Sequence, residues 1–388
     1  MHRGRHWPAL RKLSLYSTHL CGLGAAALAK AAWPALEELD LSLNTTLGSE
    51  VGAVLARGAW PRLRILELGE AELGDECAFG LALGQWPALE VLSLYQTRIG
   101  DVGVAALASA RFPRLSSLNL SNNSMGPDGA AALSAAEWPQ LTNLNLIRNR
   151  CGSEGAAALA HARWPCLKRI YLEENKITDA GAVALARAQW PALSSLDLCQ
   201  NCIGDVGALA LAKAAWPDLA SLWLSGCPIG DQGGAALAAA AWPNMRRLEL
   251  SSCNLGPSGA AALAAARWPL LANLDLSNNS IDSVGAAALA GASWPCLLSL
   301  RLDKNPIGDE GAAALAQARW LALDTLSLCD CGISVAGAVA IAEGDWPKLI
   351  HLELSRYSEG HCLEDAIRPF MDVLTNRYPL LLNRTLIV

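Results

Sequence analysis

An aromatic residue followed closely by Leu recurs along almost the whole chain at a nearly constant interval. Thirteen of the fourteen positions are Trp and one is Phe: Trp7, Trp33, Trp60, Trp86, Phe112, Trp138, Trp164, Trp190, Trp216, Trp242, Trp268, Trp294, Trp320 and Trp346. The interval is 26 residues at every step except one of 27 residues, between Trp33 and Trp60. A period of this size predicts a solenoid, in which each coil packs only on its neighbours. Function is therefore expected on a surface of the coils rather than in a central pocket.

Each period has the pattern of a strand followed by a helix. In residues 271–281, Leu274 and Leu276 are two residues apart, so both point to one face of a short strand. The Ala-rich stretch that follows predicts a helix, which the Pro after each Trp is expected to stop. An Asp stands just before this stretch in many coils, where its side chain is expected to cap free N–H groups of the helix: Asp75, Asp101, Asp128, Asp179, Asp205, Asp231 and Asp309.

Two further recurring positions indicate structural roles. Asn279 recurs as Asn44, Asn123, Asn149, Asn175, Asn201 and Asn305. A buried Asn here is expected to bond the backbone of its own turn and of the next coil. Cys227, Cys253 and Cys331 occupy the same slot and are interpreted as small buried side chains in a reducing compartment. The recurring aromatic rings are expected to form a stacked internal column at the return from helix to strand.

A strand and a helix repeated in one direction predict a parallel sheet on the concave face and helices on the convex face. Strands lie about 4.8 Å apart and helices about 8–10 Å apart, and this mismatch bends the coil into a horseshoe. The predicted fold is an α/β solenoid of about 14 repeats of 26 residues, over residues 1–357. Residues 358–388 break the register and are predicted to form a C-terminal cap. The single longer interval, within residues 44–47, predicts a small bulge in a loop.

The pattern Leu-x-x-Leu-x-Leu-x-x-Asn-x-Ile, found in residues 167–177 with Ile170 for one Leu, resembles the leucine-rich repeat family. The continuation Ile-Gly-Asp-x-Gly-Ala-x-Ala-Leu-Ala, at residues 307–316 and with Val104 at residues 99–108, is similar to its ribonuclease-inhibitor-like and GALA-type subclasses. The resemblance implies a horseshoe that binds macromolecules on its concave face. GALA-type proteins can carry an F-box ahead of the repeats, and none is visible here. The Ran GTPase-activating subclass is similar too, but its catalytic Arg maps onto no single position.

Composition argues against several classes of protein. The net charge of −6 and the pI of about 5.6 argue against nucleic acid as the main partner. No apolar run reaches the roughly 18 residues that span a bilayer, and no secretory signal is visible. A cytoplasmic location is expected, with a nuclear one as the alternative. The pairs Cys199–Cys202 and Cys329–Cys331 lack a His to complete a metal site, so no metal and no cofactor is predicted. No catalytic arrangement appears, and the chain is not expected to be an enzyme.

The strongest binding signal lies at solvent-facing strand positions. Trp223 is the only Trp outside the 26-residue register, and it takes the slot that holds Asp197 one coil before and Glu249 one coil after. Tyr171 fills this slot two coils earlier, at an expected separation of roughly 10 Å. An exposed aromatic pair flanked by charges is typical of an interface hot spot. The predicted partner-binding residues are Trp223, Tyr171, Ile147, Arg169, Glu173, Asp197, Arg247 and Glu249. The alternative is that Trp223 only fills a shallow gap.

These observations favour a non-enzymatic scaffold that binds a protein partner on its concave face. Nearby carboxylates favour a partner with basic residues: Glu173, Asp197, Glu249, Asp275 and Asp303. A weaker second patch comprises Tyr16, Ile65, Val91 and Tyr95. Two alternatives stay open. One is a GTPase-activating protein that uses a rim Arg, with Arg98, Arg148 and Arg150 as candidates; the other is a ubiquitin-ligase substrate adaptor. The first coil has no cap, which leaves either a dimer through this end or a natural protein that continues upstream.

Overall fold

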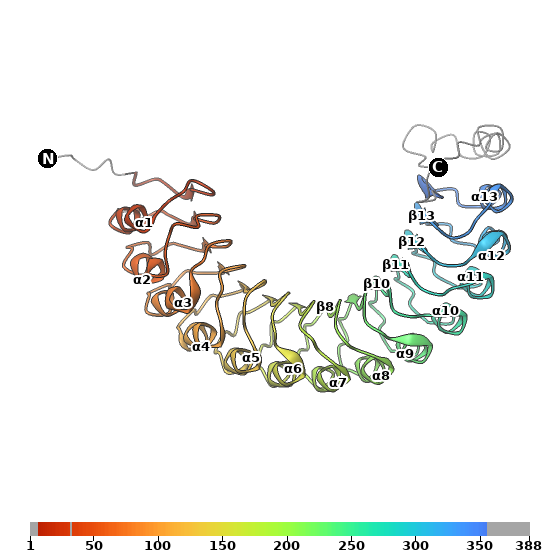
Figure 1. Ribbon diagram of the computed structural model, residues 1–388, viewed down its shortest axis with the longest axis horizontal. Coiled ribbons are helices and arrows are strands. Elements are labelled where there is room, and N and C mark those ends of the chain that lie inside the picture. The colour runs from red at the N-terminus through yellow and green to blue at the C-terminus, as the bar shows by residue number, and fades with distance from the viewer. Residues whose placement is uncertain (1–6, 32, 355–388) are drawn as a thin grey trace. The chain divides into compact units, whose positions relative to one another are not determined.

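The computed structural model describes residues 7–31 and 33–354. The chain divides into two compact units, of which unit 1 ends at Asp197 and unit 2 begins at Leu198. Both units repeat one coil: a three-residue strand, a loop, a short helix and a return through an aromatic residue. Within each unit the strands line the inner side and the helices the outer side (Figure 1). The predicted cap at residues 358–388 lies outside the described residues.

Unit 1 contains eight strands and seven helices among the described residues. The strands are β1 (Lys12–Ser14), β2 (Glu38–Asp40), β3 (Ile65–Glu67), β4 (Val91–Ser93), β5 (Ser117–Asn119), β6 (Asn143–Asn145), β7 (Arg169–Tyr171) and β8 (Ser195–Asp197). The helices are α1 (Gly22–Ala29), α2 (Val51–Leu55), α3 (Gly74–Ala82), α4 (Asp101–Ser109), α5 (Pro127–Ser134), α6 (Gly152–Leu159) and α7 (Asp179–Leu185).

Unit 2 contains six strands and six helices in its described part. The strands are β9 (Ser221–Trp223), β10 (Arg247–Glu249), β11 (Asn273–Asp275), β12 (Ser299–Arg301), β13 (Thr325–Ser327) and β14 (His351–Glu353). The helices are α8 (Asp205–Ala212), α9 (Gly230–Ala238), α10 (Pro257–Ala264), α11 (Ser283–Ala290), α12 (Gly308–Leu315) and α13 (Val335–Ala342).

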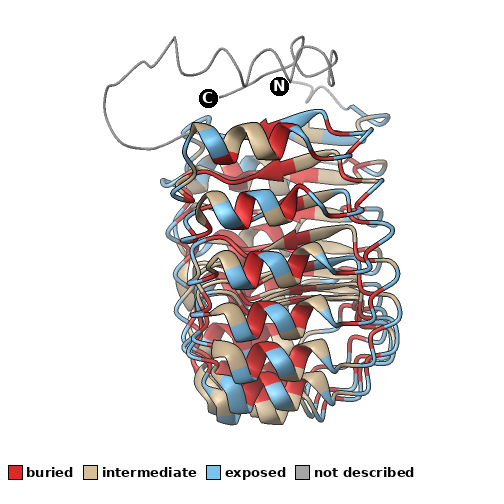
Figure 2. Cartoon of the chain, turned by 90° about the vertical axis from the view of Figure 1, so that its right-hand side faces the viewer, coloured by how far each residue is buried: buried red, intermediate tan, exposed pale blue. Residues whose placement is uncertain are grey.

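Strand pairing is parallel and keeps one register within each unit. Each strand pairs with the next strand along the chain, so that equivalent residues of successive coils lie opposite one another, as Leu248 and Leu274 do. The helices turn buried residues towards the sheet and exposed residues outwards (Figure 2). The predicted α/β solenoid with about 26 residues in each coil is confirmed.

The single 27-residue interval leaves the sheet undisturbed. Glu38 of β2 still pairs with Ile65 of β3, although the two are 27 residues apart. The extra residue is taken up in the loop after β2, where the Thr46 hydroxyl donates to the backbone oxygen of Leu20 at 2.9 Å. The prediction of an insertion confined to the loop is therefore confirmed.

The recurring aromatic residues form the predicted internal column. From Trp33 onwards all thirteen rings are buried, and the exception is Trp7, which is 53 % exposed. The rings of Trp33 and Trp60 are stacked with centroids 6.3 Å apart, and those of Trp164 and Trp190 with centroids 6.4 Å apart. These side chains belong to the core and are not available for binding.

The recurring Asn side chains hold neighbouring coils together, but they reach the preceding coil rather than the next one. The amide nitrogen of Asn279 donates to Leu276 in its own turn and to Leu250 in the coil before, at 2.9 and 2.8 Å. Its amide oxygen accepts from the backbone N–H of Cys253 at 2.9 Å. Where Cys253 itself occupies this slot, its thiol donates to Leu224 at 3.2 Å. Burial raises the pKa of Cys253 to about 12, so the thiol stays protonated and can donate.

Four of the Asp residues predicted to cap their own helices instead accept hydrogen bonds from the start of the next helix: Asp75, Asp101, Asp231 and Asp309. The carboxylate of Asp101, in the first turn of α4, accepts from the backbone N–H of Gly126 and Gly129, at 2.6 and 2.8 Å. These donors lie at the start of α5 in the next coil. Asp231 makes the same two bonds to the start of α10. The bonds link coils because the first turns of adjacent helices lie side by side, and spacing within one coil cannot reveal this.

The helices also end earlier than the sequence indicates. Helix α11 ends at Ala290, four residues before Trp294, so the Pro that follows Trp is not what stops it. Among the described residues no helix has both the length and the apolar character needed to cross a membrane.

Candidate functional site

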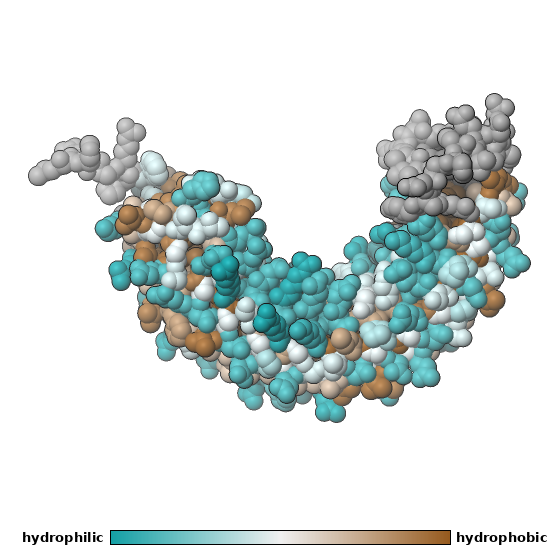
Figure 3. Space-filling view, in the orientation of Figure 1, coloured by the Kyte–Doolittle hydropathy of each residue, from teal (hydrophilic) through white to brown (hydrophobic). Residues whose placement is uncertain are grey.

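The outward-facing strand residues form a polar surface on the inner side of each unit. In a strand the middle residue points into the core and its two neighbours point away from it. In β10, Leu248 is fully buried, whereas Arg247 is exposed and Glu249 is half-buried. Figure 3 shows mainly hydrophilic residues along the inner side of the chain in this view. Residues that stand out from this polar background are the candidates for recognition.

Trp223 is placed on this outward surface, as the sequence predicts. It is the last residue of β9 and is half-buried, unlike the aromatic residues of the internal column. Glu249 of β10 lies opposite it in the sheet register. The guanidinium of Arg247 lies 3.6 Å from the Glu249 carboxylate. Three predicted residues therefore adjoin one another in unit 2: an indole, a carboxylate beside it and a cation paired to that carboxylate.

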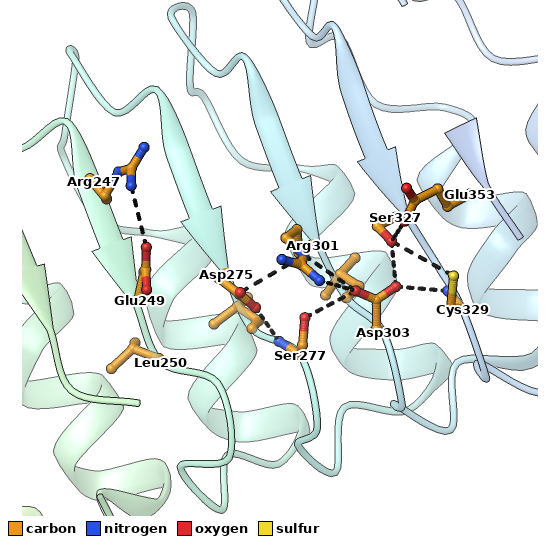
Figure 4. A network of polar contacts seen from close by, with 12 residues as sticks. Arg247, Glu249, Leu250, Asp275, Ser277, Arg301, Asp303, Ser327, Cys329 and Glu353 are labelled. Atoms are coloured by element: carbon orange, nitrogen blue, oxygen red, sulfur yellow. Dashed lines mark hydrogen bonds and ion pairs between the residues drawn. The ribbon is translucent and has the colours of Figure 1, made fainter. Parts of the chain in front are cut away.

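A network around Arg301 extends the polar surface of unit 2 towards β14 (Figure 4). The guanidinium of Arg301 lies 3.9 Å from the carboxylate of Asp275 and 3.3 Å from that of Asp303. Asp303 is only 8 % exposed and also accepts from the Ser327 hydroxyl and, at 2.8 Å, from the backbone N–H of Cys329. Burial alone lowers the pKa of Arg301, but the two carboxylates raise it above its usual value, so the cation is held firmly.

Sequence reasoning missed Arg301, although a signal was present. Among the described strands it is the only basic residue at the third strand position, which Asp or Glu often occupies. Because Arg301 neutralises Asp275 and Asp303, these two carboxylates are less able to attract a basic partner than the sequence suggested. Glu249 has its own cation in Arg247.

The predicted residues of unit 1 lie on β7, on β8 and in the turns after β6 and β7. Tyr171 is half-buried at the end of β7, and Asp197 of β8 lies opposite it in register. Arg169 is exposed on the same face, and Ile147 is half-buried beside β6. Burial raises the pKa of Glu173, and the neighbouring carboxylates of Asp197 and Glu174 raise it further. This part of the surface thus carries crowded negative charge around one aromatic ring.

Tyr171 and Trp223 belong to different units. Tyr171 belongs to unit 1 with Ile147, Arg169, Glu173 and Asp197, and Trp223 belongs to unit 2 with Arg247 and Glu249. The expected separation of roughly 10 Å between the two rings stays a prediction.

Two of the three rim arginines are engaged in ion pairs. Arg98 pairs with Glu72, and the Arg148 guanidinium lies 3.1 Å from the Glu174 carboxylate. Arg150 is exposed, and it makes no ion pair with any residue that the structure describes. Of the three candidates for insertion into a partner's active site, only Arg150 has a guanidinium that makes no ion pair with a described residue.

The cysteine pairs do not assemble with other ligands. No group of three or more His, Cys, Asp and Glu side chains is arranged to hold a metal ion in the described part of the chain. Cys331 is buried and donates to the backbone oxygen of Leu302 at 3.1 Å. Burial raises its pKa to about 12, so the thiol is protonated and can donate this bond. Cys331 thus takes the donor role that Asn has in other coils.

Seven segments match the model of the leucine-rich repeat: residues 114–134, 165–186, 192–212, 218–238, 243–264, 271–290 and 295–316. Each begins in the return before a strand and ends at or just beyond the following helix, so each match corresponds to one coil. Together with the fold, these matches identify the coils as leucine-rich repeats. The match does not distinguish the subclass. No curated relative matches the chain.

Solved structures support the same fold. An internalin (inlF) from Listeria monocytogenes has a TM-score of 0.59 and 19 % identity, over 91 % of this chain and 88 % of that one. The yeast Rad7 and Elc1 complex contains a chain with a TM-score of 0.53 and 21 % identity, over 76 % of both chains. At these identities the likeness concerns the fold alone.

Proposed function

We propose that this leucine-rich repeat protein is a non-enzymatic scaffold that binds a protein partner on the inner, strand-bearing side of its coils. Leucine-rich repeat proteins generally mediate protein–protein interaction. The chain with a similar fold in the Rad7 and Elc1 structure was solved in a complex, which is consistent with this role. The proposed contact residues are Trp223, Arg247 and Glu249 in unit 2, and Ile147, Arg169, Tyr171, Glu173 and Asp197 in unit 1.

The observation that carries the proposal is the position of Trp223. A large indole is placed half-exposed on a polar sheet, while every other Trp from Trp33 onwards is buried in the core. Keeping apolar area in water has a cost that burial against a partner would recover. Trp and Arg are also among the residues most enriched at energetically dominant interface positions, and here Arg247 of the next strand pairs with Glu249, which lies opposite Trp223.

The nature of the partner follows from charge. Crowded carboxylates around Tyr171 favour a partner with basic residues in contact with unit 1. In unit 2 Arg247 and Arg301 offset part of the negative charge, so the surface around Trp223 suits a partner of mixed charge. The acidic net charge disfavours nucleic acid. The proposal also includes a cytoplasmic or nuclear location, membership of the ribonuclease-inhibitor-like or GALA-type subclass, and a dimer formed through the first coil.

The test is capture of partners from a lysate of the native organism, followed by mass spectrometry. The double variant Trp223→Ala, Tyr171→Ala should bind the partner at least about tenfold more weakly, because truncating hot-spot residues has an effect of this size. A matched variant, Ser195→Ala with Ser299→Ala, changes one outward strand position in each unit and should bind normally. Equal retrieval by the wild type and the aromatic variant would remove these residues from the binding surface.

A further inference from the structure

Near the start of unit 1 a tyrosine ring lies across the sheet on a glycine. Two residues after strands β1 to β4 the chain carries Tyr16, Ser42, Gly69 and Tyr95 in turn. A Cβ added to Gly69 would lie 2.0 Å from the Cε1 of Tyr95, so the ring rests directly on the Gly69 backbone. The Tyr95 hydroxyl donates to the Glu70 carboxylate at 2.6 Å. Any side chain at position 69 would collide with the Tyr95 ring, so Gly69 is what allows the ring to occupy this place after β3.

The ring reaches towards residues of the first two coils. Burial raises the pKa of Tyr95, and Glu70, Tyr16 and Asp40 add to this effect through their charges. Tyr16 is 51 % exposed, whereas Ser42, between the two tyrosines, is only 3 % exposed. Of the two small residues between the tyrosines, Gly69 is the one over which the Tyr95 ring lies.

Beside this ring, two carboxylates face each other without a cation between them. Asp40 of β2 and Glu67 of β3 are opposite in register, an arrangement that is unfavourable for like charges. Asp40 accepts from the Ser14 hydroxyl at 3.0 Å and from the backbone N–H of Ser42 at 2.9 Å. Glu67 makes no ion pair with any described residue, and Lys12 of β1 is paired with Glu38 at 2.7 Å. Burial, and then the charges of Asp40 and Glu38, raise the pKa of Glu67.

An aliphatic strip completes the arrangement on the other side of the carboxylates. Ile65 of β3 and Val91 of β4 lie opposite each other in register, and both are half-buried on the outward surface. Along β3 and β4 the surface therefore runs from the aliphatic side chains, past Glu67 with Asp40 beside it on β2, to the Tyr95 ring. A Lys or Arg side chain has matching parts, since its apolar stem packs on aliphatic groups and its cationic head binds carboxylates and aromatic faces.

We propose that Asp40, Glu67 and Tyr95, with Ile65 and Val91, form a binding site for a Lys or Arg side chain on an extended segment of a protein partner. The cation relieves the repulsion between the two carboxylates, which no described side chain of the protein does. This surface lies within unit 1 and shares no residue with the surface around Trp223 and Tyr171, so it does not depend on that proposal.

The test is isothermal titration calorimetry of the full chain with two short peptides. One alternates Lys with Gly, and the other has Gln in place of each Lys. The Lys peptide should bind the wild type more tightly than the Gln peptide. Glu67→Gln should weaken binding of the Lys peptide about tenfold, the usual effect of losing one charge-assisted hydrogen bond. Gly69→Ala should weaken it as well, because the new methyl group displaces the Tyr95 ring without altering any charge.

The control is Glu137→Gln, which removes one exposed carboxylate from the return before β6 in the same unit. It should leave affinity for the Lys peptide within about twofold, as exposed charges contribute little. Trp223→Ala should also leave it unchanged. Equal binding of the two peptides would overturn the proposal, and so would equal losses for Glu137→Gln and Glu67→Gln, which would indicate attraction by net charge alone. If Gly69→Ala fails to fold, Tyr95→Leu removes the ring instead and should weaken binding in the same way.

Discussion

The buried Trp residues combine tight packing with unmet hydrogen-bonding capacity. Nine of them keep the indole N–H buried with no hydrogen-bond partner among the described residues: Trp60, Trp138, Trp164, Trp190, Trp216, Trp242, Trp268, Trp294 and Trp320. Trp86 differs, because its N–H donates to the backbone oxygen of Leu81 at 2.8 Å. A buried donor without a partner costs about 1–3 kcal/mol. The column is therefore stabilised by ring area and stacking, and Phe112 shows that one coil manages without the N–H group.

This difference predicts that the same substitution, Trp to Phe, has unequal effects on stability at positions 190 and 86. Trp190→Ala should lower the free energy of unfolding by about 3–5 kcal/mol, since it empties a fully buried aromatic site. Trp190→Phe should cost less than about 2 kcal/mol, because it also removes an unpartnered donor. Trp86→Phe should cost more than Trp190→Phe, because it leaves the Leu81 oxygen without this donor. Urea denaturation measures all three, and a larger loss for Trp190→Phe than for Trp86→Phe would contradict the explanation.

The raised pKa of Glu67 predicts that its carboxylate destabilises the fold at neutral pH. In the folded state the pKa of Glu67 lies above the ordinary 4.5. The protonated carboxyl therefore contributes to stability, and this contribution is lost as the pH rises through the pKa of the folded state. Glu67→Gln should therefore raise the free energy of unfolding at pH 7 by about 0.2–1 kcal/mol, the range for a cross-strand pair. The gain should vanish below pH 4.5. Urea titrations at several pH values test this, and a stability loss at pH 7 would show that the carboxylate supports the fold.

At the scale of the element, the helices depend on their neighbours for capping. Among the helices whose start is described, only α11 and α13 receive a side-chain cap from their own N-cap residue, Asp282 and Ser334. The start of α5 is instead satisfied by Asp101 from the first turn of α4. Such short helices are marginal in isolation, so most of their stability has to come from contacts between coils.

A matched pair of Asp residues tests this capping between coils. Asp101→Ala should lower the free energy of unfolding by about 1–2 kcal/mol, as the loss of a helix cap does. Asp128 also lies in the first turn of its helix, α5, one residue beyond the position equivalent to Asp101, but it is exposed and its side chain makes no hydrogen bond to a described residue. Asp128→Ala should therefore change stability by less than about 0.5 kcal/mol. Thermal or urea denaturation separates the two, and equal losses would mean that the bonds to Gly126 and Gly129 contribute nothing.

At the scale of the whole molecule, the sequence predicted the repeating strands and buried rings and missed hydrogen bonds that join one coil to another. The spacing of Leu274 and Leu276 was enough to predict each strand, and the recurrence of Trp was enough to predict the buried column. The acceptor of Asn279 at Leu250 and the donors to Asp101 lie in adjacent coils, so a pattern read within one coil could not identify them. The outward position of Trp223 was predictable because it breaks the period, whereas the shared carboxylates around Arg301 required the register of three strands.

The constant register also limits the kind of segment that can lie across the strands. Within a unit, equivalent outward side chains recur at the strand spacing of about 4.8 Å, whereas a peptide in the polyproline II conformation advances about 3.1 Å per residue and returns to the same face at every third residue. Two coils therefore match about three residues of such a peptide. A linear motif recognised by this protein should consequently repeat its anchoring side chains at every third position, and each anchor should skip one coil.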